Sequence, residues 1–191
     1  MATNRWKRVK WTEAGQVSQL LGWAAEPEAD AAMIPELYFD RLRTAGRLQD
    51  AVFFLGQALP RRESVSWSAR SVRDIVAGSQ APRPDVEALR ATLLWTQDPS
   101  EARRRAAFEA SERAADDSAA RLTALAAFFS GGSIAPADCP PVLAPREAAG
   151  RFAAGAVVVA AMRSADPTAA LNGALEAGDA IAASGLEGDE A

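Results

Sequence analysis

The sequence predicts an all-α fold, a single-domain orthogonal or irregular bundle of seven to nine helices. Alanine-rich stretches such as 102–110 and 124–127 are strong helix formers. No alternating β-branched segment lies between hairpin turns, and the longest β-branched run, 157–159, has alanine on both sides. With 191 residues and 49% hydrophobic content, the chain suits one domain with a substantial core.

The chain divides into three predicted parts. We expect a basic aromatic N-terminal segment over 1–12, an all-helical domain over 13–184, and an acidic, disordered tail over 185–191.

The first two helices follow from apolar residues at helical spacing. One is predicted over 13–24, with Thr12 as its N-cap, and a proline- and acid-rich turn over 26–30 follows it. The next apolar stripe lies between Pro35 and Gly46. The inward residues of the two helices are Val17, Leu20, Leu21, Ala24, Ile34, Leu37, Tyr38 and Leu42.

A helical hairpin with almost no loop is predicted over 47–59 and 60–78. Pro60 stops the first helix, because a proline inside a helix removes a hydrogen bond, and it suits the first turn of the second. Gly78 marks the end of the hairpin.

Three further helices are predicted before a long loop. One opens at Asp85, with the apolar face Val86, Leu89, Leu93 and Leu94. A second starts at 99–101, with Phe108 as its one large anchor. The stretch 116–118 resembles an N-cap, so we expect a break there and a fresh helix. The inward residues of that helix are Leu122, Leu125, Phe128 and Phe129.

The C-terminal part begins with the proline-rich loop 131–145, which is longer than ordinary connections and so is packed along the surface or used for contact. Residues 147–163 form the most buried predicted helix, in which small residues such as Gly150 and Ala154 allow close approach. Asp166 and Pro167 cap the last helix. The core prediction is Leu55, Leu59, Val65, Val72, Leu93, Phe128, Phe129, Phe152 and Val158.

Several kinds of catalytic and metal site are excluded by composition. The chain has no histidine, and Cys139 is its one cysteine. Ser-His-Asp triads, Cys-His pairs and the usual zinc sites therefore cannot be built, and no EF-hand pattern is present. We predict that the protein is not an enzyme and has no catalytic residues, no cofactor and no metal. A single cysteine agrees with a reducing compartment.

Charge is distributed unevenly along the chain. Residues 1–105 hold 16 Lys/Arg against 13 Asp/Glu, whereas residues 106–191 hold 5 against 12. Nucleic-acid binders normally have a much stronger basic excess, so we predict no nucleic-acid partner. Opposite-sign patches instead favour a protein partner. Homo-oligomerisation is left open.

Neither a membrane span nor an export signal is predicted. The most apolar run, 152–162, is too short, because a spanning helix needs about 20 residues. Arg61 and Arg62 look like a twin-arginine signal, but they lie a third of the way along and are followed by Glu63 and further charges rather than an apolar stretch. We therefore expect a cytoplasmic protein.

The paired arginines Arg61 and Arg62 allow two interpretations. They fall in the first turn of a predicted helix, where the helix dipole disfavours cations by roughly 0.3–1 kcal/mol each. Such a helix start could hold a partner's carboxylate or a phosphate. Alternatively they pair with Glu63, Asp50 or another local acid, which we favour because such pairs are common on helical surfaces.

Two other basic stretches invite the same question. Trp6 and Trp11 interleave with basic residues and could contact a partner, an anionic membrane or single-stranded nucleic acid, or could fold back over the core with Val9. The run 103–105 holds three arginines that point in different directions on a helix, and nearby glutamates neutralise them. We therefore expect that run to be a solvated face.

Two stretches carry a resemblance to a known family. They are 50–67, which reads DAVFFL, then ALPRRESV and Trp67, and 126–136, which reads AAFFSGGSIAP, followed by the alanine-rich helix around 155–157. The chain resembles an uncharacterised family of all-α bacterial proteins found near type VI secretion genes, some of them mislabelled as twin-arginine signal proteins. Ser66 and Ser68 flank Trp67 where relatives are often bulkier. The resemblance implies a secretion-associated role and supplies no catalytic residue.

We therefore expect a non-enzymatic cytoplasmic interaction protein, an adaptor, chaperone or accessory factor whose partner is a secreted effector or secretion component. The alternative is an enzyme or binding module that acts on a phosphorylated or other anionic ligand through arginines. The candidate partner-binding residues are Arg61, Arg62, Arg70, Arg73, Trp6 and Trp11.

Overall fold

The computed structural model describes residues 4–24, 27–136 and 138–186. In these ranges the fold is all-α and single-domain, as the sequence predicts, with nine helices of at least two turns and the single-turn α2. An isolated antiparallel bridge joins Ser133 to Leu143. The helices are α1 (Ala14–Leu21), α2 (Glu28–Ala31), α3 (Pro35–Thr44), α4 (Leu48–Ala58), α5 (Arg61–Ile75), α6 (Arg83–Gln97), α7 (Glu101–Ser111), α8 (Ala119–Phe129), α9 (Ala148–Met162) and α10 (Pro167–Ser184).

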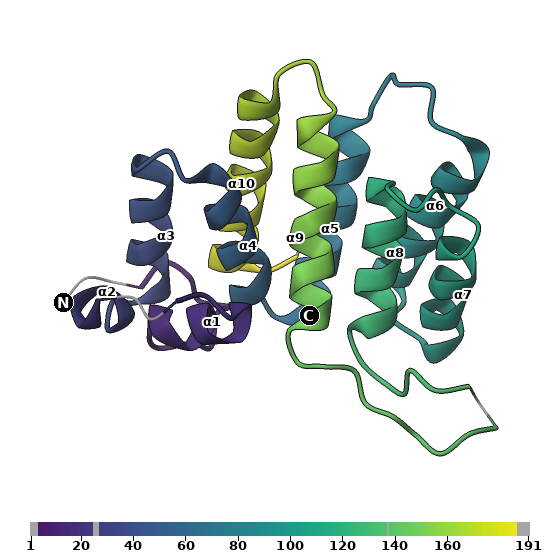
Figure 1. Ribbon diagram of the computed structural model, residues 1–191, viewed down its shortest axis with the longest axis horizontal. Coiled ribbons are helices and arrows are strands. Elements are labelled where there is room, and N and C mark those ends of the chain that lie inside the picture. Colours follow the sequence, from purple (N-terminus) through teal and green to yellow (C-terminus); the bar gives the residue numbers. More distant parts are fainter. Residues whose placement is uncertain (1–3, 25–26, 137, 187–191) are drawn as a thin grey trace.

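Figure 1 shows an elongated bundle with α9 near its middle. Helices α1 to α3 lie at one end and α6 to α8 at the other, while α4, α5, α9 and α10 fill the centre. Helix α9 contacts α4, α5, α8 and α10, which gives it a central place in the bundle. The prediction that it is the most buried helix is wrong, because α4, α5 and α8 have larger shares of buried residues. The described helices include none that is long and apolar enough to cross a membrane.

Local sequence signals fix most helix starts. The predicted caps Ser118 and Asp166 are confirmed, because their side chains accept hydrogen bonds from the backbone N–H groups of Arg121 and Ala169. The predicted N-cap Thr12 is wrong by one residue. Glu13 occupies that position and forms a reciprocal capping box with Gln16.

The predicted hairpin over 47–78 is correct in its two-residue link but not in its packing. Helices α4 and α5 are joined only by residues 59–60, as Pro60 predicts. The two helices nevertheless contact each other much less than each contacts α9, and α10 also packs against both. They therefore diverge from the link and enclose the C-terminal helices.

Small residues set the distance between α4 and α9. A Cβ added to Gly150 would lie 2.9 Å from the carbonyl oxygen of Gly56, and one added to Gly56 would lie 3.1 Å from the Cβ of Ala154. The two backbones therefore touch, and this confirms the predicted role of Gly150 and Ala154. The contact also brings the first turn of α9 against the last turn of α4.

The predicted core is confirmed in part. Leu55, Leu59, Val65, Val72 and Phe128 are buried. The remaining four predicted core residues, Leu93, Phe129, Phe152 and Val158, are half-buried.

The predicted face of α6 is correct in part, since Leu89 and Leu93 are half-buried and Leu89 packs against the core. Ala88, Thr92 and Trp95 point inward, whereas Val86 and Leu94 are exposed. Because residues one position apart on a helix differ by about 100°, a small shift in the chosen stripe exchanges inside for outside.

The N-terminal segment packs back onto the bundle. Trp6 is 1% exposed, its ring lies 5.0 Å from that of Phe39, and its indole N–H donates to Asp179 of α10. Arg5 bridges α3 and α10, with hydrogen bonds to Asp40 at 2.7 and 2.8 Å and to Asp179 at 3.0 and 3.2 Å. These carboxylates raise the pKa of the Arg5 guanidinium, the Asp40 hydrogen bonds being the largest cause. The segment therefore holds α3 against α10.

The predicted tail lies mostly outside the described residues. Of 185–191, only Gly185 and Leu186 are described, and Leu186 is buried in the main core cluster.

Candidate functional site

The four arginines singled out in the sequence lie along α5 but do not gather in one place. Arg61 and Arg62 open the helix, and Arg73 lies 12 residues further on, about 18 Å along the axis at 1.5 Å per residue. Arg70 is half-buried, while Arg61 and Arg73 are exposed. These positions separate the two ends of α5 into different surroundings.

Arg61 has no ion pair with the local acids that we favoured as its partners. Glu63 pairs with Arg8 at 2.9 Å, and Asp50 pairs with Arg47 at 2.7 Å. The Arg61 guanidinium donates instead to the carbonyl oxygen of Ser130 at 3.2 Å. A carbonyl carries no net charge, so the cation of Arg61 is not neutralised by these contacts.

Arg62 and Arg73 both have partners within the protein. Arg62 is half-buried and donates to the carbonyl oxygen of Thr96 in α6. Arg73 forms a hydrogen bond of 2.8 Å with Asp74, which raises the pKa of Arg73. Arg73 is therefore already paired, and it lies far from Arg61.

The candidate residues Trp6 and Trp11 differ in how far their side chains are buried. Trp6 belongs to the core and presents almost no surface, so the fold-back interpretation is confirmed for Trp6, and for Val9 at 8% exposed. Trp11 is half-buried, with part of its ring packed on the core. Its remaining surface lines a hollow that it shares with Arg61.

This hollow, which we call the basic pocket, has a volume of about 210 Å³. It lies where the N-terminal segment, α1, the end of α4, the start of α5 and the approach to α9 meet. Its walls are Lys10, Trp11, Leu20, residues 57–61 and Arg146. Two of the six sequence candidates, Trp11 and Arg61, therefore meet in one place.

The basic pocket has three cations and no carboxylate in its walls. Lys10 and Arg146 are exposed, and among the described residues neither they nor Arg61 form an ion pair. Glu147 follows Arg146 but does not line the pocket. Three cations so close together raise the local positive potential, which favours an incoming anion.

Two helix starts add to this potential. Gly150 in the first turn of α9 lies against Gln57, so α5 and α9 begin near the same pocket. Within the described residues no side chain caps either helix. The N-terminal end of a helix carries partial positive charge on its free N–H groups, and this end also attracts anions.

Gln57 supplies a polar group that the fold leaves without a partner. Its side chain is 7% exposed, and its Oε1 atom has no hydrogen-bond partner among the described residues. Buried amides are normally hydrogen-bonded, because a lost partner costs about 1–3 kcal/mol. The oxygen faces Gly150 of α9, so this unsatisfied group lies inside the contact between α4 and α9.

The side chains that line the basic pocket carry basic, amide or apolar groups. Its walls hold no carboxylate, thiol or hydroxyl side chain that could serve as a general base or nucleophile. The described residues also contain no cluster of three or more side chains suited to hold a metal ion.

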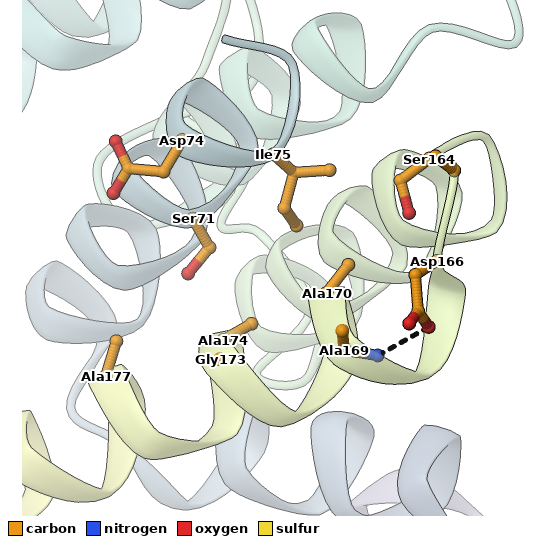
Figure 2. A pocket seen from close by; sticks show the side chains of 11 residues that line it. Ser71, Asp74, Ile75, Ser164, Asp166, Ala169, Ala170, Gly173, Ala174 and Ala177 are labelled. Atoms are coloured by element: carbon orange, nitrogen blue, oxygen red, sulfur yellow. Dashed lines mark hydrogen bonds between the residues drawn. The ribbon is translucent and has the colours of Figure 1, made fainter.

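Figure 2 shows a larger and different hollow, of about 520 Å³, between α5 and α10. Its floor is made of small residues such as Ala170 and Gly173, with Ser71 pointing between the helices. Its two carboxylates are already engaged, since Asp74 pairs with Arg73 and Asp166 caps α10. This groove therefore lacks the free charge of the basic pocket.

The solvated face expected for 103–105 is wrong for Arg104. That residue is 4% exposed, lies over the ring of Phe128 at 4.7 Å, and bonds to Glu101 at 2.6 and 2.8 Å. It also donates to the carbonyl oxygens of Phe128 and Ser133. Arg104 therefore anchors the proline-rich loop to α7 and α8, as a structural residue.

Two residues of the basic pocket were missed by sequence reasoning. Arg146 shares one signal with Arg61, because both are cations at a predicted helix start. Gln57 has no such signal, since its burial and its lack of a partner arise from the contact with α9.

Comparison with known proteins gives one family. A family model described as "Family of unknown function (DUF6931)" matches residues 38–182. No curated protein and no solved structure matches the chain.

Proposed function

The chain belongs to DUF6931, a family of unknown function, and from this premise we propose that it is a non-enzymatic interaction protein. It holds an acidic segment of a partner protein in the basic pocket. The observation that carries the proposal is the meeting of Lys10, Arg61 and Arg146 around Trp11 without any carboxylate in the wall. Unpaired cations beside an aromatic ring are typical of protein-binding surfaces, where arginine and tryptophan are enriched.

The proposed role is that of an adaptor, chaperone or accessory factor in type VI secretion. This finer proposal rests on the resemblance of 50–67 and 126–136 to proteins found near type VI secretion genes. We place the role in the cytoplasm, because the twin-arginine stretch that could suggest export begins α5 and belongs to the folded domain.

The test is capture of partners by variants that differ at one position of α5. Arg61→Gln removes a cation of the basic pocket, and Arg73→Gln is its matched control on the same helix. We expect the parent and Arg73→Gln to retain the same partner from a lysate of the native host, and Arg61→Gln to lose it. Circular dichroism and thermal melts verify that all three proteins are folded.

Two further readouts sharpen this test. Binding to the captured partner should weaken as salt is raised, because screening reduces contacts between exposed charges. Retention of the partner by Arg61→Gln and by Lys10→Gln would remove the basic pocket from the interaction. A partner with no connection to secretion would overturn the finer proposal alone.

The second candidate is a binding module for a phosphorylated or other anionic small ligand, which the three cations also suit. It predicts that the purified parent releases a phosphorylated small molecule on denaturation and that Arg61→Gln does not. Mass spectrometry of the released material distinguishes this outcome from a protein partner.

A further inference from the structure

We propose that the acidic stretch 187–191 of this chain occupies the basic pocket from within the same molecule and competes there with the partner's acidic segment. This inference rests on the proposed function and names a regulation of the same pocket. The stretch lies outside the described residues, and three properties of the chain support it as the occupant: the place where the chain leaves α10, its charge and its length.

The chain leaves α10 beside the N-terminal segment. Gly185 ends the helix with a φ of 89°, which glycine adopts without strain, and the next residue, Leu186, is buried in the main core cluster. A Cβ added to Gly185 would lie 3.1 Å from Nε of Arg8, whose backbone N–H donates to the carbonyl oxygen of Ala182 at 3.0 Å. The acidic stretch therefore starts next to Arg8, two residues before Lys10.

The acidic stretch carries the charge that the basic pocket lacks. Three of its five residues are acids, Glu187, Asp189 and Glu190, and it holds no cation. The pocket has three cations, which form no ion pair within the described residues, and no carboxylate in its walls. Because the two charge sets are complementary, each neutralises the other. The stretch also contributes to the acidic excess of residues 106–191.

Other cations near the start of the stretch are poorer partners for it. Arg8 already pairs with Glu63 of α5 at 2.9 Å. Lys7 is exposed and does not line the pocket, and an isolated pair between exposed side chains contributes little. Three cations that line one hollow raise the local positive potential more than a single cation does. The basic pocket is therefore the stronger attraction for the acids.

The length of the chain permits the contact. Four residues lead from Gly185 to Asp189, and when extended they span about 14 Å at 3.3–3.6 Å per residue. Lys10 is separated from Arg8 by at most about 7 Å of chain on the same scale, so Asp189 and Glu190 can reach its ammonium group. A tethered segment acts at an effective concentration on the order of millimolar, so a contact with a millimolar Kd suffices to occupy the pocket.

The test compares the parent with a neutral-tail variant of the full chain, Glu187→Gln/Asp189→Asn/Glu190→Gln, by ¹H–¹⁵N NMR. The indole signal of Trp11 and the Nε–H signal of Arg61 report on the pocket. We expect both signals to differ between the two proteins at low salt. Raising the salt should move the parent's signals towards those of the variant, because screening weakens contacts between exposed charges.

A blocked peptide with the sequence of residues 186–191 is the probe for the vacated pocket. It should bind the neutral-tail variant about fivefold more tightly than the parent, because the tethered acids of the parent compete with it. In the neutral-tail background, Arg61→Gln should lose most of this binding. Lys7→Gln is the matched control and should retain it, since Lys7 is a neighbouring cation that does not line the pocket.

Identical Trp11 and Arg61 signals in the parent and the neutral-tail variant would overturn the inference, and so would equal binding of the peptide to both proteins. Loss of peptide binding on Lys7→Gln would overturn it as well, because the acids would then lie along the N-terminal segment. A signal difference that grows with protein concentration would place the stretch in the pocket of a second copy and contradict occupation within one molecule.

The capture experiment separates this inference from the proposed function. If both hold, the neutral-tail variant should capture more of the partner than the parent does. Capture that is lost on Arg61→Gln but equal for the parent and the neutral-tail variant would support the proposed function and contradict the regulation. Differing NMR signals together with capture that Arg61→Gln leaves unchanged would overturn the proposed function, while the occupation of the pocket by the stretch would stand.

Discussion

At the scale of single residues, α5 carries buried hydroxyls with different surroundings. The Ser64 hydroxyl donates to the carbonyl oxygen of Gly56 at 2.7 Å, whereas the hydroxyls of Ser66 and Ser68 meet no hydrogen-bond partner within the described residues. All three side chains are at most 1% exposed. Helix α5 contacts α4, α6, α8, α9 and α10, so its serines lie in the packed interior, where a hydroxyl without a partner costs free energy.

We predict that Ser66→Ala and Ser68→Ala each raise the free energy of unfolding by about 1 kcal/mol, because each removes a buried hydroxyl without a partner. Ser64→Ala is the matched control and should lower it by about 1 kcal/mol, since its hydrogen bond is lost. Urea denaturation measures all three variants. Destabilisation by Ser66→Ala and Ser68→Ala comparable to that of Ser64→Ala would show that their hydroxyls are satisfied.

A second residue-scale prediction concerns Glu101. Its hydrogen bond with Arg104 is the main cause that lowers its pKa from 4.5 to about 2, and Arg105 contributes as well. A lowered folded-state pKa stabilises the fold above the unfolded-state value, and this contribution is lost as pH falls from about 4.5 towards 2. The free energy of unfolding of the parent should therefore fall across that window more than that of Glu101→Gln.

The control for Glu101 is Glu109→Gln on the same helix, whose carboxylate forms no ion pair in the described part of the chain. At neutral pH Glu109→Gln should lower the free energy of unfolding less than Glu101→Gln does, because it removes no ion pair. A Glu101→Gln curve of stability against pH that runs parallel to that of the parent would contradict the assigned ion pair.

At the scale of elements, α10 contains two glycines in opposite environments. A Cβ added to Gly178 would lie 2.4 Å from Leu55 and 2.8 Å from the indole nitrogen of Trp67, which donates to the carbonyl oxygen of Ala174. A Cβ added to Gly173 would meet nothing within 4 Å. The same substitution in one helix therefore separates close packing from helix propensity.

We predict that Gly178→Ala lowers the free energy of unfolding by about 1–3 kcal/mol, because α10 must move away from α4 and α5. Gly173→Ala should raise it by about 0.5–1 kcal/mol, because alanine restricts the unfolded chain more than glycine does. Thermal melts of the two variants give opposite shifts if the packing is as described. Stabilisation by both variants would mean that α10 is not held closely at Gly178.

At the scale of the whole molecule, the N-terminal segment joins elements far apart in the sequence. Arg5 and Trp6 connect α3 with α10, and Arg8 reaches Glu63 of α5. The backbone N–H of Arg8 also donates to the carbonyl oxygen of Ala182 at 3.0 Å. The segment thus stabilises the end of the bundle that also forms the wall of the basic pocket.

We predict that Trp6→Ala lowers the free energy of unfolding by about 3–5 kcal/mol, as expected for removal of a fully buried aromatic side chain. Trp11→Ala is the control from the same segment and should cost less, because its ring is only half-buried. Denaturant titration separates the two. Equal losses would indicate that Trp6 does not belong to the core.

The sequence predicted only some of the residues that line the basic pocket. The sequence points to Arg61 and Trp11 because a cation at a helix start and an aromatic among basic residues are local patterns. Gln57 and Arg146 depend on contacts between distant segments, since the pocket is closed by α4 meeting the approach to α9. Arg62 and Trp6 share these local patterns, but in the folded protein Arg62 is half-buried and Trp6 is buried in the core.

The sequence by itself determined the fold class and most helix boundaries of this protein. Alanine content, the proline at position 60 and the caps Ser118 and Asp166 act through the backbone of their own neighbours, so they can be read locally. Which side of α6 faces inward, why Arg104 is buried and how Lys10, Arg61 and Arg146 meet were decided only by the tertiary structure. Burial and electrostatic potential depend on groups brought together from distant parts of the chain, and no local pattern specifies that proximity.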